Sequence, residues 1–151
     1  MNPRDFYRTA EELVVLPSAS EANFRSAISR GYYAVFISIQ TNLLKQTSKE
    51  LLKNAQLSNQ LAHEFVIRAL CRSSNPEISE IGKQLGIRSD ARKVADYNMT
   101  EQIEKKNAEY QLKAVQQLLA DIDTFGLPRL ISYLIQHIRD LAQARSGTQT
   151  P

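Results

Sequence analysis

The 151-residue chain has a single cysteine, Cys71, so it cannot form an internal disulfide bond, and a reducing cytosol is its simplest environment. No segment approaches the run of about eighteen apolar residues that a membrane span needs. The first residues, MNPRD, also lack the basic stretch and apolar run of a secretory signal. The sequence therefore predicts a soluble, cytoplasmic protein with no membrane partner.

Several patterns that would indicate a cofactor or a familiar catalytic site are also missing. There is no glycine-rich phosphate loop and no His/Cys spacing typical of zinc, so neither a cofactor nor a metal is expected. Ser26, Ser29 and Cys71 have no local base and orienting group beside them. Nucleophilic catalysis therefore has no specific support.

Alternating strand patterns do not persist for more than a few residues, whereas apolar residues recur every three or four positions along most of the chain. Glycine and proline, five of each, lie largely at the breaks between these segments. No internal repeat or linker divides the chain. We predict an all-α fold, a single up-and-down bundle of five to six helices over residues 1–145, followed by a disordered tail over 146–151.

Capping residues, glycine and proline predict where the helices begin and end. Ser18 and Glu21 can form a capping box, and Thr100 can cap a later helix. Gly126 and Pro128 form a stop-and-restart signal. The helices are expected at about 3–15, 18–45, 58–73, 76–97, 100–125 and 128–145, with 48–56 as a loop or a frayed turn.

Two helices carry features beyond an ordinary apolar stripe. Gly31 lies inside a helix, where glycine costs about 1 kcal/mol relative to alanine, so it is expected at a close helix–helix approach. The last helix is apolar on more than one side. It is expected either in the core between neighbouring helices or at a subunit contact.

The apolar stripe of the helix that starts at Pro76 becomes ionic toward its end, where it passes through Arg88, Arg92 and Asp96. Arg92 and Asp96 are four residues apart, close enough for an ion pair. An exposed ion pair of this kind contributes little to the stability of the fold. In a buried pair, the desolvation of the two charges costs more free energy than their attraction provides, unless the pair is fully hydrogen-bonded. We predict a semi-buried position at a groove or interface, with a purely structural salt bridge as the alternative.

The chain is mildly basic, with a net charge of +3, which permits a nucleic-acid partner without requiring one. Lys83, Arg88, Arg92 and Lys93 gather in one stretch against only Asp90. This cluster is either a solvated helix face or part of a surface that binds RNA.

Three parts of the chain carry a family resemblance: residues 25–36, RSAISRGYYAVF; His63 in LAHEF; and residues 92–97, RKVADY. Together they resemble the HEPN-domain family of small bacterial and archaeal helical proteins, in particular its branch with an AISRAYYAVF helix and an R-x-x-ADY helix end. The resemblance covers about residues 8–120. It implies a dimeric helical bundle tied to RNA metabolism, often encoded beside a nucleotidyltransferase as a toxin–antitoxin or defence pair.

In the ribonuclease members of that family, an arginine is followed roughly four to six residues later by a histidine. Arg92 matches the arginine, but Asp96, Tyr97 and Asn98 stand where the histidine would fall. Imidazole can move a proton near neutral pH, whereas an ionised aspartate cannot donate and a tyrosine with a pKa of about 10 seldom accepts. The resemblance therefore implies a degenerate nuclease motif.

The candidate catalytic residues are Arg92, Asp96 and Tyr97, and the candidates for RNA or nucleotide binding are Arg30, Tyr33, His63 and Arg88. Tyr32 and Tyr33 point about 100° apart on their helix, so one can be buried while the other faces a groove, for base stacking or for packing. If Arg30, His63 and Arg92 converge, they form a cationic pocket suited to phosphate. Otherwise His63 is a hydrogen-bonded structural residue.

The residues and the resemblance together predict a HEPN-like RNA- or nucleotide-associated protein with a degenerate nuclease motif, paired with a nucleotidyltransferase in a toxin–antitoxin or defence system. One alternative is an active metal-independent ribonuclease toxin that uses Arg92, Asp96 and Tyr97 through a different proton path. Another is a non-catalytic interaction module whose ionic stripe only fixes helix register. The expected partners are a second copy in a homodimer, RNA, and a nucleotidyltransferase-type protein.

Overall fold

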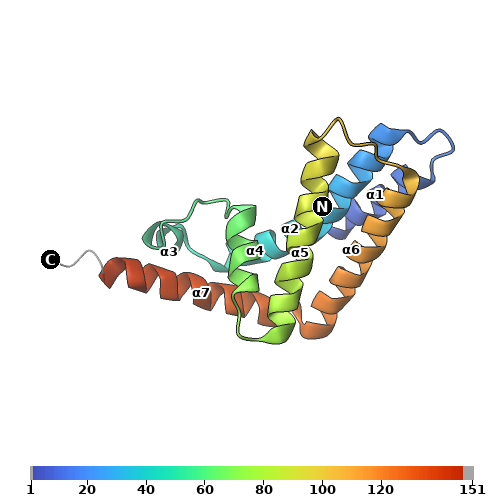
Figure 1. Ribbon diagram of the computed structural model, residues 1–151. Helices are drawn as coiled ribbons and strands as arrows, with labels where there is room; N and C mark the ends of the chain where they lie inside the picture. The colour runs from blue at the N-terminus through green and yellow to red at the C-terminus, as the bar shows by residue number, and fades with distance from the viewer. Residues whose placement is uncertain (1, 148–151) are drawn as a thin grey trace.

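The computed structural model describes residues 2–147, which are all-helical, as predicted (Figure 1). The described helices are α1 Arg4–Val15, α2 Glu21–Gln46, α3 Lys49–Asn54, α4 His63–Cys71, α5 Pro76–Tyr97, α6 Lys105–Phe125 and α7 Leu127–Gly147. The additional helix is α3, in the range expected to be a loop or a frayed turn. Its N-cap is Ser48, whose hydroxyl oxygen accepts a hydrogen bond from the Leu51 N–H at 3.0 Å.

The predicted capping box of Ser18 and Glu21 at the start of α2 is wrong. The chain turns at Pro17 and Ser18, and α2 begins at Glu21 with Ser20 as its N-cap. The Ser20 N–H donates to the Asn23 side-chain oxygen at 2.9 Å, which satisfies one of the free N–H groups at this end. The turn after Pro17 therefore moves the cap two residues along the chain.

Two later helices also begin after their predicted caps. Between Ser58 and α4, the chain turns through Leu61, which has a φ of 52° and a buried side chain. Thr100 does not cap α6, because its N–H donates to the Asn98 side-chain oxygen at 3.1 Å in a turn that follows α5. The N-cap of α6 is Glu104.

The chain restarts between α6 and α7 at the predicted residues. Gly126 has a φ of 103°, which suits glycine, and Pro128 lies in the first turn of α7. The predicted tail begins too early, because Ser146 and Gly147 are still part of α7. Residues 148–151 of that predicted tail lie outside the described residues.

Helix α2 is central, since it packs against α1, α5, α6 and α7. Helix α7 extends away from the α5–α6 pair, and α3 lies along it (Figure 1). The sequence left open whether the wide apolar face of α7 belongs to the core or to a subunit contact. Its residues are buried within the chain: Leu130, Ile131, Leu134 and Ile135. The broad apolar arc of α7 is therefore core. Over residues 2–147, no helix is both long and apolar enough to cross a membrane.

Two glycines allow helices around the site to pack closely. A Cβ atom at Gly31 would lie 2.8 Å from Leu112 Cδ2 of α6, which agrees with the predicted close helix approach. A Cβ atom at Gly82 of α5 would lie 2.6 Å from the backbone nitrogen of Cys71 in α4. The close approach at Gly82 holds α4 and α5, which carry His63 and Arg92, in fixed relation.

Candidate functional site

The side chain of Arg92 lies where α5 meets α2, and it is almost fully buried, with 8% of the residue exposed. Its guanidinium carbon is 5.4 Å from the ring centroid of Tyr32 and 5.6 Å from that of Tyr33. Its Nη1 is 3.4 Å from Asp96 Oδ2. The structure thus contains the predicted ion pair in a semi-buried position.

The surroundings of Arg92 compensate its charge incompletely. Its Nε is buried, with no hydrogen-bond partner among residues 2–147. The desolvation of a buried ion costs several kcal/mol, whereas a cation–π contact returns about 0.5–2 kcal/mol. Arg88 Nε and Ser89 Oγ of the same helix are also buried without a hydrogen-bond partner in this part of the chain, and each such group calls for a physical explanation.

His63 is the first residue of α4, and its ring lies among aromatic side chains of α2. Its Nδ1 is 2.6 Å from the Tyr32 hydroxyl oxygen, and its ring stacks on Phe36 with centroids 3.8 Å apart. Burial lowers the pKa of His63 below its ordinary value, and the positive charges of Arg92 and Lys93 lower it further. His63, although distant from Arg92 in sequence, therefore belongs to the same cluster.

Protonation states in this cluster follow from burial. The Tyr32 side chain is buried, which raises its pKa to about 12, so it keeps its proton at neutral pH. His63 is neutral there, and we assign the Tyr32 hydroxyl as the donor to Nδ1, which places the imidazole proton on Nε2. The free nitrogen of His63 is a donor in this arrangement.

Tyr33 and Asp96 complete the cluster. Tyr33 is half-buried, and its ring meets the His63 ring edge-on, with centroids 5.8 Å apart. The Ser29 hydroxyl donates to Asp96 Oδ2 at 3.2 Å, so the carboxylate that pairs with Arg92 also joins α5 to α2. Tyr32 is thus the buried ring and Tyr33 the one nearer to solvent, the division predicted for this pair.

Arg30 and Lys93 are exposed. Arg30 is one turn before Tyr33 on α2, and no hydrogen bond or ion pair within residues 2–147 joins it to the cluster. Of Arg30, His63 and Arg92, the structure brings His63 and Arg92 together. Arg30 lies outside their contacts.

Arg88 turns toward a different helix from Arg92. It is 6% exposed, its Nη1 donates to the Gln111 side-chain oxygen at 2.7 Å, and its guanidinium carbon is 5.9 Å from the Tyr110 ring centroid. Both partners are on α6. The two arginines of the α5 stripe therefore contact different helices, Arg88 on the α6 side and Arg92 on the α2 side.

Tyr97, the last residue of α5, is 73% exposed. Its neighbour Asp96 is held by Ser29 and Arg92. Tyr97 makes no hydrogen bond to Asp96 within the described chain. The three candidate catalytic residues therefore separate into the buried Arg92 with its half-buried partner Asp96, and the exposed ring of Tyr97.

Arg25, the first residue of the segment 25–36, positions the end of α5, a role that the sequence did not predict. Its Nη1 donates to the backbone oxygens of Ala95 at 2.9 Å and Asn98 at 3.0 Å, and its Nε donates to the Glu21 carboxylate at 2.9 Å. Hydrogen bonds from Arg25 and from the Ile103 N–H lower the pKa of Glu21. The Glu21–Arg25 spacing of four residues was a usable signal for the ion pair, but not for the contacts with α5.

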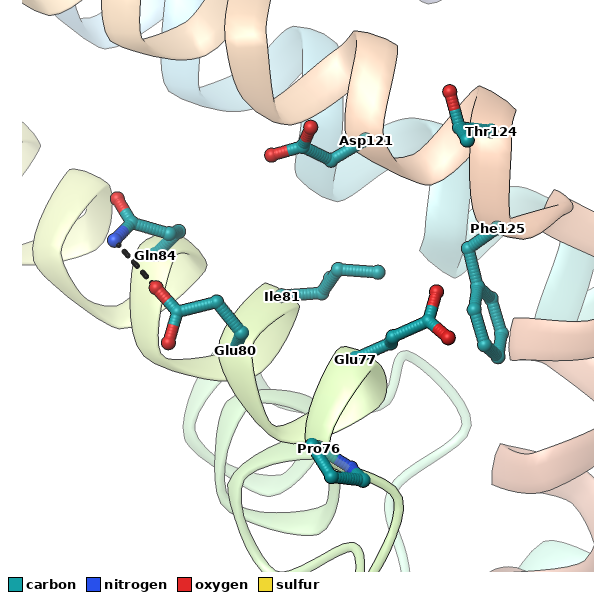
Figure 2. Close-up of a pocket in the computed structure, with 8 residues that line it drawn as sticks. All are labelled: Pro76, Glu77, Glu80, Ile81, Gln84, Asp121, Thr124 and Phe125. Carbon is teal, nitrogen blue, oxygen red and sulfur yellow. Dashed lines mark hydrogen bonds between the residues drawn. The ribbon is translucent and has the colours of Figure 1, made fainter.

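A separate pocket of about 350 Å³ lies toward the other end of α5 (Figure 2). Its walls carry the carboxylates of Glu77, Glu80 and Asp121, over the apolar side chains of Ile81 and Phe125. Three carboxylates without a lining cation disfavour a phosphate ligand. Within residues 2–147, no group of three or more His, Cys, Asp or Glu residues is placed to hold a metal ion.

The chain matches no protein-family model, no curated protein and no solved structure. The function must therefore be inferred from the chemistry of the site itself.

Proposed function

We propose that the protein is a HEPN-like RNA- or nucleotide-binding protein that holds phosphate at Arg92. The observation that carries this proposal is the incompletely compensated guanidinium of Arg92. It is buried against two tyrosine rings, and its carboxylate partner within residues 2–147, Asp96, is 3.4 Å away. Arginine presents a planar fork of donors that matches phosphate oxygens. Because Nε is buried, a phosphate would contact the guanidinium through its Nη atoms and would add negative charge there.

The groups around Arg92 support the same ligand. Lys93 is exposed beside it, and its charge reaches His63. Tyr33 offers a half-buried ring, and His63 offers an Nε2–H donor. Cations interleaved with aromatic rings are the pattern by which proteins bind unpaired RNA.

The resemblance to the HEPN family carries the rest of the proposal. It supports a homodimer and a nucleotidyltransferase-type partner within a toxin–antitoxin or defence pair. We expect nuclease activity to be weakened or lost, because Asp96, Tyr97 and Asn98 stand where the motif histidine would fall, and Nδ1 of His63 is engaged by Tyr32. A non-catalytic interaction module is one alternative, and it predicts no RNA affinity.

A second candidate function, a metal-independent ribonuclease, is favoured by one observation. His63 lies in the same cluster as Arg92 although the two residues are far apart in sequence. A change of tautomer would allow His63 to accept a proton near neutral pH. The proton path would then run through His63 rather than through the exposed Tyr97.

RNA binding is tested by fluorescence anisotropy with a labelled single-stranded RNA over a range of salt concentrations. Charge-assisted hydrogen bonds contribute about 1.5–3 kcal/mol, so Arg92→Gln should weaken binding about ten- to hundredfold and reduce the salt slope by about one. Arg139→Gln removes an exposed arginine from α7 and is the matched control, with affinity expected to be unchanged. Wild-type protein that does not bind, or equal binding by Arg92→Gln, would reject the proposal.

Cleavage is tested by incubating the protein with a mixed RNA pool without metal, beside Arg92→Ala and His63→Gln. Intact RNA is the expected result for all three proteins. New RNA ends with the wild type alone would establish the ribonuclease instead, with both residues required.

A further inference from the structure

Two exposed carbon-rich side chains lie beside the Arg92 cluster, at the carboxyl end of α5. Tyr97 is 73% exposed and Met99 is 72% exposed. Both line one open hollow of about 690 Å³, together with Arg92, Lys93 and Val94. Single exposed apolar residues are common on protein surfaces, but these two share a hollow with two cations.

The turn that carries these side chains is held in place before any ligand arrives. The Asn98 side-chain oxygen accepts hydrogen bonds from the Thr100 N–H at 3.1 Å and from the Thr100 hydroxyl at 2.7 Å. The Asn98 backbone oxygen accepts from Arg25 of α2 at 3.0 Å. A surface fixed in this way loses little conformational entropy when it binds.

The charges around the hollow distinguish it from a purely apolar docking face. Arg92 reaches the hollow from the buried cluster, and Lys93 is exposed at its edge. The nearby carboxylate of Asp96 is already engaged by Ser29 and Arg92. The hollow therefore offers an aromatic face and a thioether next to positive charge, which matches the base and phosphate of one nucleotide.

We infer that this hollow holds one unpaired nucleobase of single-stranded RNA, stacked on Tyr97 and flanked by Met99, with the adjoining phosphate on Arg92 and Lys93. This inference rests on the proposed function, since Arg92 is the shared phosphate contact. Bases in a duplex are stacked on each other and cannot offer a face to Tyr97. The ligand is thus an unpaired strand, and neither duplex RNA nor free phosphate satisfies the whole site.

The test uses an RNA oligonucleotide that carries 2-aminopurine, whose fluorescence is quenched by stacking. The chain has no tryptophan, so the probe is read without tryptophan emission. Tyr97→Ala should weaken binding of single strands about tenfold and remove the quenching, because one stacked base is lost. Tyr97→Phe keeps the ring and should keep both signals. Tyr110→Ala, which removes another exposed ring on α6, should change neither.

The possible results separate the inference from the proposed function. If binding depends on Arg92, but Tyr97→Ala binds normal and abasic strands as tightly as the wild type, the base site is wrong and the phosphate site stands. If the wild type binds no RNA, both the base site and the proposed function are wrong. If Tyr97→Ala dissociates an oligomer in light scattering without changing RNA affinity, the hollow is a protein contact and the inference is overturned.

Discussion

The imidazole of His63 lies against Phe36 and accepts a hydrogen bond from the buried hydroxyl of Tyr32. This arrangement favours the neutral ring, since both burial and two nearby cations lower the pKa of His63. Protonation would place a charge beside Arg92 and would turn Nδ1 from an acceptor into a donor. The histidine therefore links the integrity of the cluster to pH.

This link predicts how stability changes with pH. The pKa of His63 is lower in the folded protein than its ordinary value of about 6.5, so the unfolded chain binds more protons as the pH falls below that value. The free energy of unfolding should therefore decrease between pH 7 and pH 5. In His63→Gln this decrease should be smaller, as measured by urea unfolding at each pH. His137→Gln is the control for the other histidine, and equal slopes for wild type and His63→Gln would contradict the prediction.

At the scale of the helix, the contact of α5 with α4 depends on a missing side chain. A Cβ atom at Gly82 would lie 2.6 Å from the Cys71 nitrogen and 2.8 Å from the Leu70 carbonyl carbon, and these backbone atoms cannot move aside. At Gly86 the nearest atom would be the Ile67 Cγ2 methyl at 3.3 Å, which would need to move by only a few tenths of an ångström. The two glycines of one helix thus face different constraints.

Alanine at these two positions should have different effects on stability. Gly82→Ala should lower the free energy of unfolding by about 1–3 kcal/mol, because it forces α4 and α5 apart. Gly86→Ala is the matched control, and its gain in helix propensity of up to about 1 kcal/mol should offset a small side-chain adjustment. Urea unfolding measures both variants. Equal stabilities for the two would show that the close contact at Gly82 is not a constraint.

Helix positions were predictable where periodicity is long, as in α2 and α5, and so was the break at Gly126, whereas α3 and the N-caps of α2, α4 and α6 were not. Helix α3 has only six residues, too few for a reliable repeat of apolar positions. Ser20 and Ser18 are chemically equivalent caps, and the turn at Pro17 decides between them. The formation of α3 and the choice of the N-cap of α2 depend on local backbone geometry, which the pattern of residue types does not specify.

For the whole molecule, the fold class followed from the sequence, but the composition of the site followed only in part. Periodicity predicts which face of each helix is buried, but not which neighbouring helix that face meets. Arg88 and Arg92 share one stripe, yet the first contacts α6 and the second contacts α2. His63 joins Arg92 only because α4 and α5 pack side by side.

The charges of the whole molecule also differ between the two ends of α5. The pocket near Glu77 and Asp121 is acidic, whereas Arg92 and Lys93 lie at the opposite end. Photo-crosslinking of bound RNA, read by mass spectrometry, should label peptides that contain Tyr33 or Tyr97. It should not label residues 76–84 or 121–125. Labelling at the acidic end would place RNA elsewhere and contradict the assigned site.

The guanidinium of Arg25 has a consequence for the order in which the site forms. It binds the carbonyl oxygens of Ala95 and Asn98, so α2 adds to the cap that the Asn98 N–H makes with the Val94 oxygen at 3.0 Å. The last turn of α5 is therefore more stable once α2 has docked. In amide hydrogen exchange, the start of α2 and the end of α5 should open together as one cooperative unit. The Arg92 cluster would then be lost as a whole rather than residue by residue.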